Sequence, residues 1–269
     1  MSDRIQVTRH GGVADVRLNR PEKMNALDPA MFAALASTSE ELAADPSLRC
    51  VVLSGEGRSF CAGLDFAGFQ SMTDREADHS ADVEPDLPED RITHRGQQAV
   101  YGWTELPVPV IAAVHGHALG GGIQLALGAD IRIVAPDAKL SILEIRWGLV
   151  PDMTGTQALV NLVGLDVAKE LTFTGRTVSG TEAVELGLCT RLADDPHGAA
   201  MALAEEIAAK SPNAIRAAKR LFATAPKDSI AEGFANERRE IGRLIGSPNQ
   251  IEQVKAFFEK RDPVFADPD

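Results

Sequence analysis

Hydrophobic residues fall in short, separate runs along the first half of the chain, with glycines or polar residues between them. Residues 5–9 and 13–18 are rich in β-branched residues and are joined through Gly11 and Gly12, a pattern that predicts a β-hairpin. Three further apolar runs predict buried strands, and these are residues 50–55, 110–114 and 131–135. The first half therefore supplies the strands of a sheet.

Helical patterns lie between and after these strands. Asp28 precedes Pro29, which places an N-cap residue before a proline at the first helical position, and apolar residues follow at helical spacing. A second, short helix is predicted at residues 120–128. Strands that alternate with helices indicate an α/β layered core, whereas only helical patterns follow from about residue 200 onward. We therefore expect an α/β core over residues 1–199 and a helical region over residues 200–269.

The charge balance narrows the class of partner. Lys and Arg number 27 against 39 Asp and Glu, a formal net charge of −12. A surface of that sign repels phosphate backbones and anionic lipid, so we expect neither a nucleic-acid nor a membrane partner. No apolar run approaches the ~20 residues that span a bilayer, and the polar N-terminal residues contain no signal-like stretch. Three cysteines without a CxxC pair are typical of a reducing compartment, which predicts a cytoplasmic location.

An acidic segment at residues 77–90 differs from its surroundings, because it is rich in Asp, Glu and Pro and poor in apolar residues. This composition predicts a solvated loop. A lid over a site is the alternative interpretation, since long loops in compact domains often carry function.

Successive glycines at Gly120, Gly121 and Gly122 are the strongest local signal for a functional site. They open the predicted short helix, although each glycine costs about 1 kcal/mol against alanine inside a helix. Their spacing does not fit the G-x-G-x-x-G of dinucleotide sites, and no P-loop lysine follows, so a nucleotide site is disfavoured. A helix start with free N–H groups also suits a developing oxyanion, and the glycine turn at residues 60–65 can supply a second N–H. Either loop alone is more often a simple tight turn.

Together, these segments resemble the crotonase (enoyl-CoA hydratase/isomerase) family over nearly the whole chain. The matching segments occur in the family's order, and they are residues 20–27 (RPEKMNAL), 60–65 (FCAGLD), 118–130 (ALGGGIQLALGAD), 141–152 (SILEIRWGLVPD) and 257–261 (FFEKR). The resemblance implies a spiral of repeated ββα units followed by helices that mediate assembly into a homotrimer or a dimer of trimers.

The resemblance also implies an enzyme that acts on acyl-CoA thioesters. By motif position, the backbone N–H groups of Leu64 and Gly121 would form the oxyanion hole that holds a thioester enolate. The residues that would line the CoA moiety belong to two loops, and they are Asn25, Ala26, Leu27, Ala62 and Asp65. No metal or redox cofactor is implied, and coenzyme A is part of the substrate.

The proton-handling positions depart from the family's hydratase pattern. Hydratases of the family carry two glutamates, whereas this chain has Gln124 at the first position and Glu144 at the second. A neutral amide can hold a water molecule but cannot accept its proton, and loss of a positioned acid–base group usually costs about 10²–10⁴ in rate. Gln124 is therefore predicted to be a hydrogen-bonding residue of the substrate pocket. Glu144, in apolar company, is predicted to have a raised pKa and to transfer the proton.

Two further residues, both later in the sequence than Glu144, complete the predicted site. Asp152 precedes a predicted helix, where it is either a helix cap or a second catalytic acid, as in the dienoyl-CoA isomerase branch of the family. Thr154 and Gln157 already have the spacing of a capping box there, which weakens the capping interpretation without removing it. Trp147 is close to Glu144 in sequence and is predicted to contact the substrate.

The predicted function is double-bond isomerisation of an unsaturated fatty acyl-CoA, because isomerisation needs only one carboxylate that moves a proton between C2 and C4. Hydration of a 2-enoyl-CoA is the first alternative. A non-catalytic acyl-CoA-binding or scaffold protein is the alternative from another class.

Overall fold

The computed structural model describes residues 3–65 and 92–268 of the 269-residue chain. The acidic segment at residues 77–90, predicted to be a loop or a lid, lies outside the described residues. In the described part, no helix is long and apolar enough to cross a membrane.

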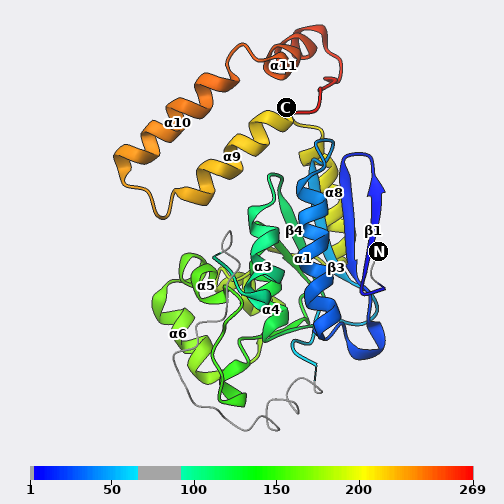
Figure 1. The fold of residues 1–269 in the computed structure, drawn as a ribbon, viewed down its shortest axis with the longest axis vertical. Helices are drawn as coiled ribbons and strands as arrows, with labels where there is room; N and C mark the ends of the chain where they lie inside the picture. Colours follow the sequence, from blue (N-terminus) through cyan, green and yellow to red (C-terminus); the bar gives the residue numbers. More distant parts are fainter. Residues whose placement is uncertain (1–2, 66–91, 269) are drawn as a thin grey trace.

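A six-stranded sheet forms the centre of the molecule (Figure 1). Its strands, in spatial order, are β1 (Ile5–His10), β2 (Val13–Leu18), β3 (Cys50–Gly55), β4 (Val110–Val114), β6 (Ile131–Val134) and β9 (Arg191–Leu192). The β1–β2 pair is antiparallel, as the predicted hairpin requires, and every later pair is parallel. The predicted strands are confirmed, with β6 ending at Val134 rather than one residue later.

A second, smaller sheet runs beside the first and consists of β5 (His117–Leu119), β7 (Lys139–Ser141) and β8 (Val178–Ser179). The chain passes from β4 to β5 and then into helix α4 (Gly121–Leu127), and it repeats this course from β6 through β7 into the 3₁₀ helix η2 (Glu144–Trp147). Each repeat therefore places one strand in each sheet before a helix. This is the ββα unit that the family resemblance implied.

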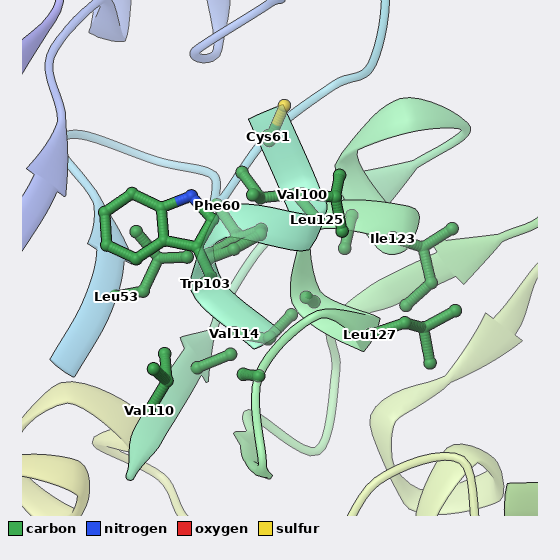
Figure 2. Packing of buried hydrophobic residues seen from close by; sticks show 14 of the residues in the cluster. Leu53, Phe60, Cys61, Val100, Trp103, Val110, Val114, Ile123, Leu125 and Leu127 are labelled. Carbon is green, nitrogen blue, oxygen red and sulfur yellow. The ribbon is translucent and has the colours of Figure 1, made fainter. Parts of the chain in front are cut away.

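Side chains of the central strands point alternately to the two faces of the sheet, and the apolar core therefore has two layers, one on each face. In β3, Val51 and Leu53 face the main apolar cluster, while Cys50 and Val52 face a second cluster on the opposite side. Because successive side chains of a strand point to opposite faces, a strand buried on both faces is apolar throughout. The main cluster includes the fully buried Trp103 (Figure 2).

Helices cover both faces of the large sheet. Helices α1 (Pro29–Ala43) and α3 (Arg95–Glu105) pack against each other over the main cluster. Asp28 caps α1 by accepting the N–H of Met31 at 2.7 Å, and Pro29 occupies the first helical position, as predicted. Helix α8 (Pro196–Ala208) covers the opposite face, where Ala200 and Ala204 are fully buried.

The predicted boundary between residues 199 and 200 thus falls inside α8, a helix of the core. Small alanine side chains let α8 approach the sheet closely, so its packing holds it to the α/β layer. The helices that leave the core begin one element later, and they are α9 (Pro212–Thr224), α10 (Ile230–Leu244) and α11 (Pro248–Glu259). Figure 1 shows α9 and α10 side by side. Helix α9 is joined to the core through Lys219, whose Nζ donates to Oδ2 of Asp130 at 2.8 Å.

The remaining helices follow η2 in the chain, apart from one short turn near its start. They are α5 (Gly155–Val163), α6 (Leu165–Thr174) and α7 (Gly180–Glu185), together with the short 3₁₀ turn η1 (Pro21–Lys23) near the hairpin. Helix α5 packs against α4, and α6 packs against η2. These contacts place the end of the small sheet, α4 and η2 around a common centre.

Candidate active site

The two glycine loops singled out in the sequence are hydrogen-bonded to each other. The N–H of Cys61 donates to the carbonyl of His117 at 2.9 Å, and the N–H of Leu119 donates to the carbonyl of Cys61 at 3.1 Å. This short parallel bridge between Cys61 and Ala118 aligns residues 60–65 with the start of α4. Segments almost sixty residues apart in the chain therefore form one wall.

The N–H groups of Leu64 and Gly121 lie at this junction. Leu64 is held by a bridge to Leu27, in which the N–H of Leu27 donates to the carbonyl of Gly63 at 2.8 Å. A Cβ atom on Gly63 would lie 2.5 Å from the carbonyl oxygen of Leu119 and 3.6 Å from the nitrogen of Gly121, and Gly63 has φ +87°. Only glycine permits this conformation and this approach.

Both N–H groups are available to a ligand within the described part of the chain, where neither has a hydrogen-bond partner. The N–H of Gly121 is the first of α4, and the first N–H groups of a helix have no acceptor within the helix. Two N–H donors that face the same oxygen can stabilise the negative charge that it gains.

Glu144 is the buried carboxylate of this site. It opens η2 and is 9% exposed, which differs from a glutamate that points to solvent at a strand end. A Cβ atom on Gly120 would lie 3.5 Å from Oε1 of Glu144, so the carboxyl group lies against the start of α4. Burial raises the pKa of Glu144, and the negative charge of Asp152 raises it further. The predicted direction of the pKa shift is confirmed.

Gln124 contacts Glu144 directly and is fully buried. Its amide Nε2 donates to Oε1 of Glu144 at 2.6 Å. This hydrogen bond favours the charged form and so opposes the rise in the pKa of Glu144. The structure therefore brings the two predicted proton-handling positions into contact.

Asp152 has an exposed side chain near the start of α5. The N-cap residue of α5 is Thr154, whose φ of +69° is left-handed and whose side chain makes no cap hydrogen bond. The predicted capping box of Thr154 and Gln157 is therefore wrong, because a left-handed N-cap residue turns its hydroxyl away from the first turn. Asp152 makes no capping hydrogen bond among the described residues either, and its effect on Glu144 is electrostatic.

Trp147 ends η2 with 49% of its surface exposed. Its neighbours Ile145, Leu149 and Val150 are also exposed, so the segment after Glu144 presents an apolar surface rather than a packed core. Contact of Trp147 with a substrate stays a prediction.

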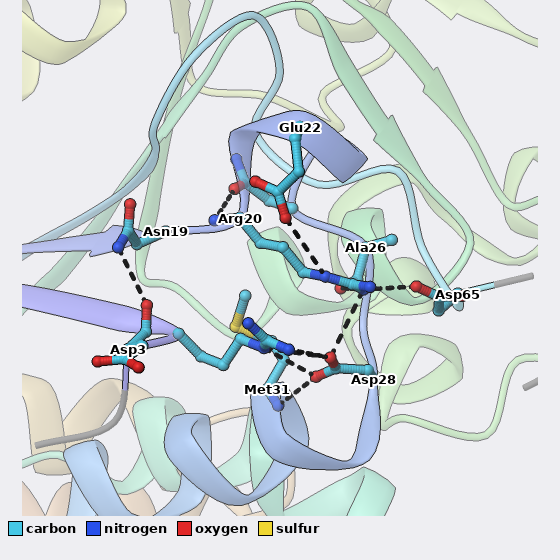
Figure 3. A network of polar contacts seen from close by, with 10 residues as sticks. Asp3, Asn19, Arg20, Glu22, Ala26, Asp28, Met31 and Asp65 are labelled. Atoms are coloured by element: carbon cyan, nitrogen blue, oxygen red, sulfur yellow. Dashed lines mark hydrogen bonds and ion pairs between the residues drawn. The ribbon is translucent and has the colours of Figure 1, made fainter. Parts of the chain in front are cut away.

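The loop predicted to line CoA is held by a network of polar contacts (Figure 3). Arg20 Nη1 donates to Oδ2 of Asp65 at 2.5 Å and to the carbonyl of Ala26 at 3.1 Å, and it lies 3.6 Å from Oδ2 of Asp28. The network ties residues 20–28 to the loop that carries Leu64. Sequence reasoning missed Arg20, although it opens the RPEKMNAL segment, because its partner Asp65 is 45 residues away.

The side chain of Asn25 makes hydrogen bonds to backbone groups of the protein. Its Oδ1 accepts the N–H of Arg20 at 2.8 Å, and its Nδ2 donates to the carbonyls of Glu56 and Ser59 at 2.9 and 2.8 Å. Asn25 is fully buried at φ +56°, a conformation that asparagine tolerates better than most residues. A role for Asn25, Ala26, Leu27, Ala62 or Asp65 in CoA binding stays a prediction.

Replacement of Asn25 by alanine is expected to lower the free energy of unfolding by about 2–4 kcal/mol. The change removes the side-chain partner of three backbone groups, those of Arg20, Glu56 and Ser59. Each group costs about 1–3 kcal/mol if it stays buried and unpaired, and less where water can reach it. Urea denaturation measures the loss. Asn19→Ala is the matched control, because the Asn19 side chain makes an exposed contact with the carbonyl of Asp3. Equal effects of both substitutions would contradict the structural role.

The described residues of the site provide neither a cysteine nucleophile nor a cluster of metal ligands. Burial raises the pKa of the Cys61 thiol to about 12, and its Sγ donates to the carbonyl of Asn25 at 3.1 Å, so Cys61 is a packed thiol rather than a thiolate nucleophile. Across residues 3–65 and 92–268, no three His, Cys, Asp or Glu side chains are grouped as metal ligands.

The chain is similar to known proteins over almost its whole length. The family model described as Enoyl-CoA hydratase/isomerase matches residues 8–268. A probable enoyl-CoA hydratase of Bacillus subtilis is 36% identical over 256 residues, which cover 94% of this chain and 95% of that protein. The crystal structure of an enoyl-CoA hydratase from Bacillus anthracis superposes with a TM-score of 0.86 at 31% identity, over 98% of this chain and 100% of that one. Pseudomonas aeruginosa DspI has the same TM-score at 32% identity, over 98% and 97%.

Proposed function

The chain belongs to the enoyl-CoA hydratase/isomerase family, an enzyme family with the crotonase-type fold, and we propose that it isomerises the double bond of an unsaturated fatty acyl-CoA. One observation carries the choice of isomerisation. Glu144 is a buried carboxylate with a raised pKa, and the side chain that contacts it at 2.6 Å is the neutral amide of Gln124. A site with one such carboxylate suits a reaction that needs one acid–base group.

In the proposed reaction, the Glu144 carboxylate removes a proton from C2 of a 3-enoyl-CoA thioester. The electron pair moves into the thioester, whose oxygen becomes an oxyanion that accepts hydrogen bonds from the N–H groups of Leu64 and Gly121. The protonated Glu144 then donates the same proton to C4, and the double bond moves from C3–C4 to C2–C3. No atom is gained or lost, and no cofactor takes part beyond the coenzyme A of the substrate.

Hydration of a 2-enoyl-CoA is the second candidate, and a specific observation favours it. Asp152 acts electrostatically on Glu144 from the exposed side of the site, so it could serve as the second group that hydration needs. Several relatives, including the Bacillus subtilis protein, carry the name enoyl-CoA hydratase. Asp152 could equally act with Glu144 on a 3,5-dienoyl-CoA.

The test is a product analysis with 2-enoyl-, 3-enoyl- and 3,5-dienoyl-CoA thioesters, which chromatography separates from 3-hydroxyacyl-CoA. We expect 3-enoyl-CoA to be converted to 2-enoyl-CoA much faster than 2-enoyl-CoA is hydrated. Gln124→Glu, which restores a second buried carboxyl group, is expected to gain hydration. Gln157→Glu is its matched control, because Gln157 is exposed on α5. Hydration by the unmodified protein that is faster than isomerisation would refute the proposal in favour of the hydratase.

We also propose that the helices after α8 bind further copies of the chain in a trimer or a dimer of trimers. Support comes from large apolar side chains that the single chain leaves exposed on these helices, among them Phe222, Phe234, Phe257 and Phe258. Light scattering of the purified protein measures the assembly, and a monomer at micromolar concentration would contradict it.

A further inference from the structure

Gln124 joins two elements of the site through the two ends of one amide. Its Oε1 accepts the N–H of Met153 at 2.9 Å and the N–H of Gly155 at 3.1 Å. These N–H groups belong to the start of α5, where Thr154 makes no cap of its own. Gln124 therefore supplies the cap of α5 from α4, across the interior of the protein.

The capping contacts fix which way the amide faces. Two N–H donors converge on one end of Gln124, so this end must be the carbonyl oxygen, because the NH₂ group has no lone pair to accept them. The NH₂ group is consequently directed at Oε1 of Glu144, 2.6 Å away. A reversed amide would bring donors against donors at α5.

Glu144 is left with two unequal oxygens. Oε1 accepts from Gln124, whereas Oε2 is buried and has no hydrogen-bond partner in the part of the chain that the structure describes. An oxygen that accepts a strong hydrogen bond is a poorer site for a proton than one that accepts none. Oε2 is thus the oxygen free to take up and release a proton.

Gly155 leaves the space that this arrangement requires. A Cβ atom on Gly155 would lie 2.7 Å from Oε1 and 2.8 Å from Cγ of Gln124. Any larger residue would displace the glutamine side chain from the start of α5, and with it the donor that faces Glu144.

We propose that Gln124 is a positioning residue: anchored by the backbone of Met153 and Gly155, it holds Oε1 of Glu144 and assigns proton transfer to Oε2. The inference rests on the proposed function, in which Glu144 is the acid–base group. Gln124 then acts on the substrate through Glu144, which is a different role from the direct contact predicted from the sequence.

The test compares pH profiles of kcat/KM for 3-enoyl-CoA in the unmodified protein and in Gln124→Met, which has similar length but no amide. Among residues 3–65 and 92–268, the ionisable neighbour whose charge acts on Glu144 is Asp152, from the segment before α5, whereas α4 presents the neutral amide of Gln124. Loss of the Gln124 hydrogen bond removes an interaction that favours the carboxylate, so the acid limb of the profile is expected to move to higher pH. We expect kcat to fall by about tenfold or more, because the carboxylate is no longer held in place, with KM changed far less.

Gly155→Ala is the second variant, since it displaces Gln124 without altering any of its atoms and is expected to shift the acid limb in the same direction. Gln157→Met is the matched control, expected to leave the profile unchanged. An acid limb that stays in place in both Gln124→Met and Gly155→Ala, with kcat lowered or not, would overturn the inference and leave Gln124 a structural cap.

Failure of the proposed function has a different signature. If Glu144→Gln keeps its activity, then Glu144 is not the acid–base group, and the proposed function fails together with the inference. If Glu144→Gln is inactive while the acid limb of Gln124→Met does not move, only the inference fails. If the protein hydrates rather than isomerises, the same profiles are measured on 2-enoyl-CoA.

Discussion

Replacement of Glu144 by glutamine is expected to lower kcat/KM for the thioester reaction by about 10²–10⁴-fold, the usual effect of losing a positioned acid–base group. The amide keeps the volume of the side chain, and its oxygen can still accept the hydrogen bond that Gln124 donates. It cannot take up a proton from the substrate. Binding of the CoA thioester should change little, so the loss should appear in kcat.

The same substitution is expected to stabilise the protein at neutral pH. Burial raises the pKa of Glu144 in the folded state, so the charged form is less favourable there than in the unfolded chain. This cost is absent at low pH, where Glu144 is protonated in both the folded and the unfolded protein. It grows as the pH rises from the pKa of Glu144 in the unfolded chain to its pKa in the folded protein, and it is fully present above the folded pKa. Glu144→Gln removes the cost, and its gain in melting temperature should therefore shrink as the pH falls toward about 4.

Thermal unfolding at several pH values, paired with the activity assay, checks both effects. Glu185→Gln is the matched control, because Glu185 is exposed at the end of α7 and should change neither activity nor stability. A melting-temperature difference between Glu144→Gln and the unmodified protein that does not change with pH would contradict the raised pKa of Glu144. A Glu144→Gln protein that is stabilised and fully active would remove Glu144 from the mechanism.

The elements that the sequence predicted well are those whose pattern is local. The hairpin and the strands β3 and β4 were predicted from runs of β-branched and apolar residues, which are typical of buried strands. The start of α1 was predicted from two adjacent residues, Asp28 and Pro29. The small sheet was not predicted, since its strands have two or three residues, too few for alternation to be visible. The boundary at residue 199 fell within α8 because helical periodicity does not tell which surface a helix covers.

The contacts of the site could not be predicted from spacing alone. Gln124 bonds to Glu144, Met153 and Gly155, which are 20 to 31 residues further along the chain. Its type and position suggested a pocket residue, and nothing local shows that it caps another helix. The apolar neighbours of Glu144 in sequence predicted the correct direction of its pKa shift for an incomplete reason, because Ile145 and Trp147 are exposed and the burial comes from other elements.

Replacement of Gly121 by proline is expected to lower kcat by about 10²–10³-fold, the usual effect of removing one donor from an oxyanion hole. Gly121 is the first residue of α4, a position where proline is tolerated because the N–H there is not used within the helix. The substitution removes the N–H proposed to face the thioester oxygen while the helix keeps all of its own hydrogen bonds. The unfolding free energy should therefore change far less than the activity.

Gly121→Ala separates the loss of the N–H from the effect of added volume. Alanine keeps the donor and adds only a Cβ atom, which would lie 2.8 Å from Cδ1 of Leu27 and 2.9 Å from Sδ of Met153, both at the ends of flexible side chains that can move aside. Proline adds ring atoms as well and also deletes the donor. If the oxygen of the enolate depends on this N–H, then Gly121→Ala retains most of the activity and Gly121→Pro does not. Equal losses of activity in Gly121→Ala and Gly121→Pro would mean that the space around Gly121 matters and its N–H does not. The donors that stabilise the enolate oxygen would then be other N–H groups of the two glycine loops.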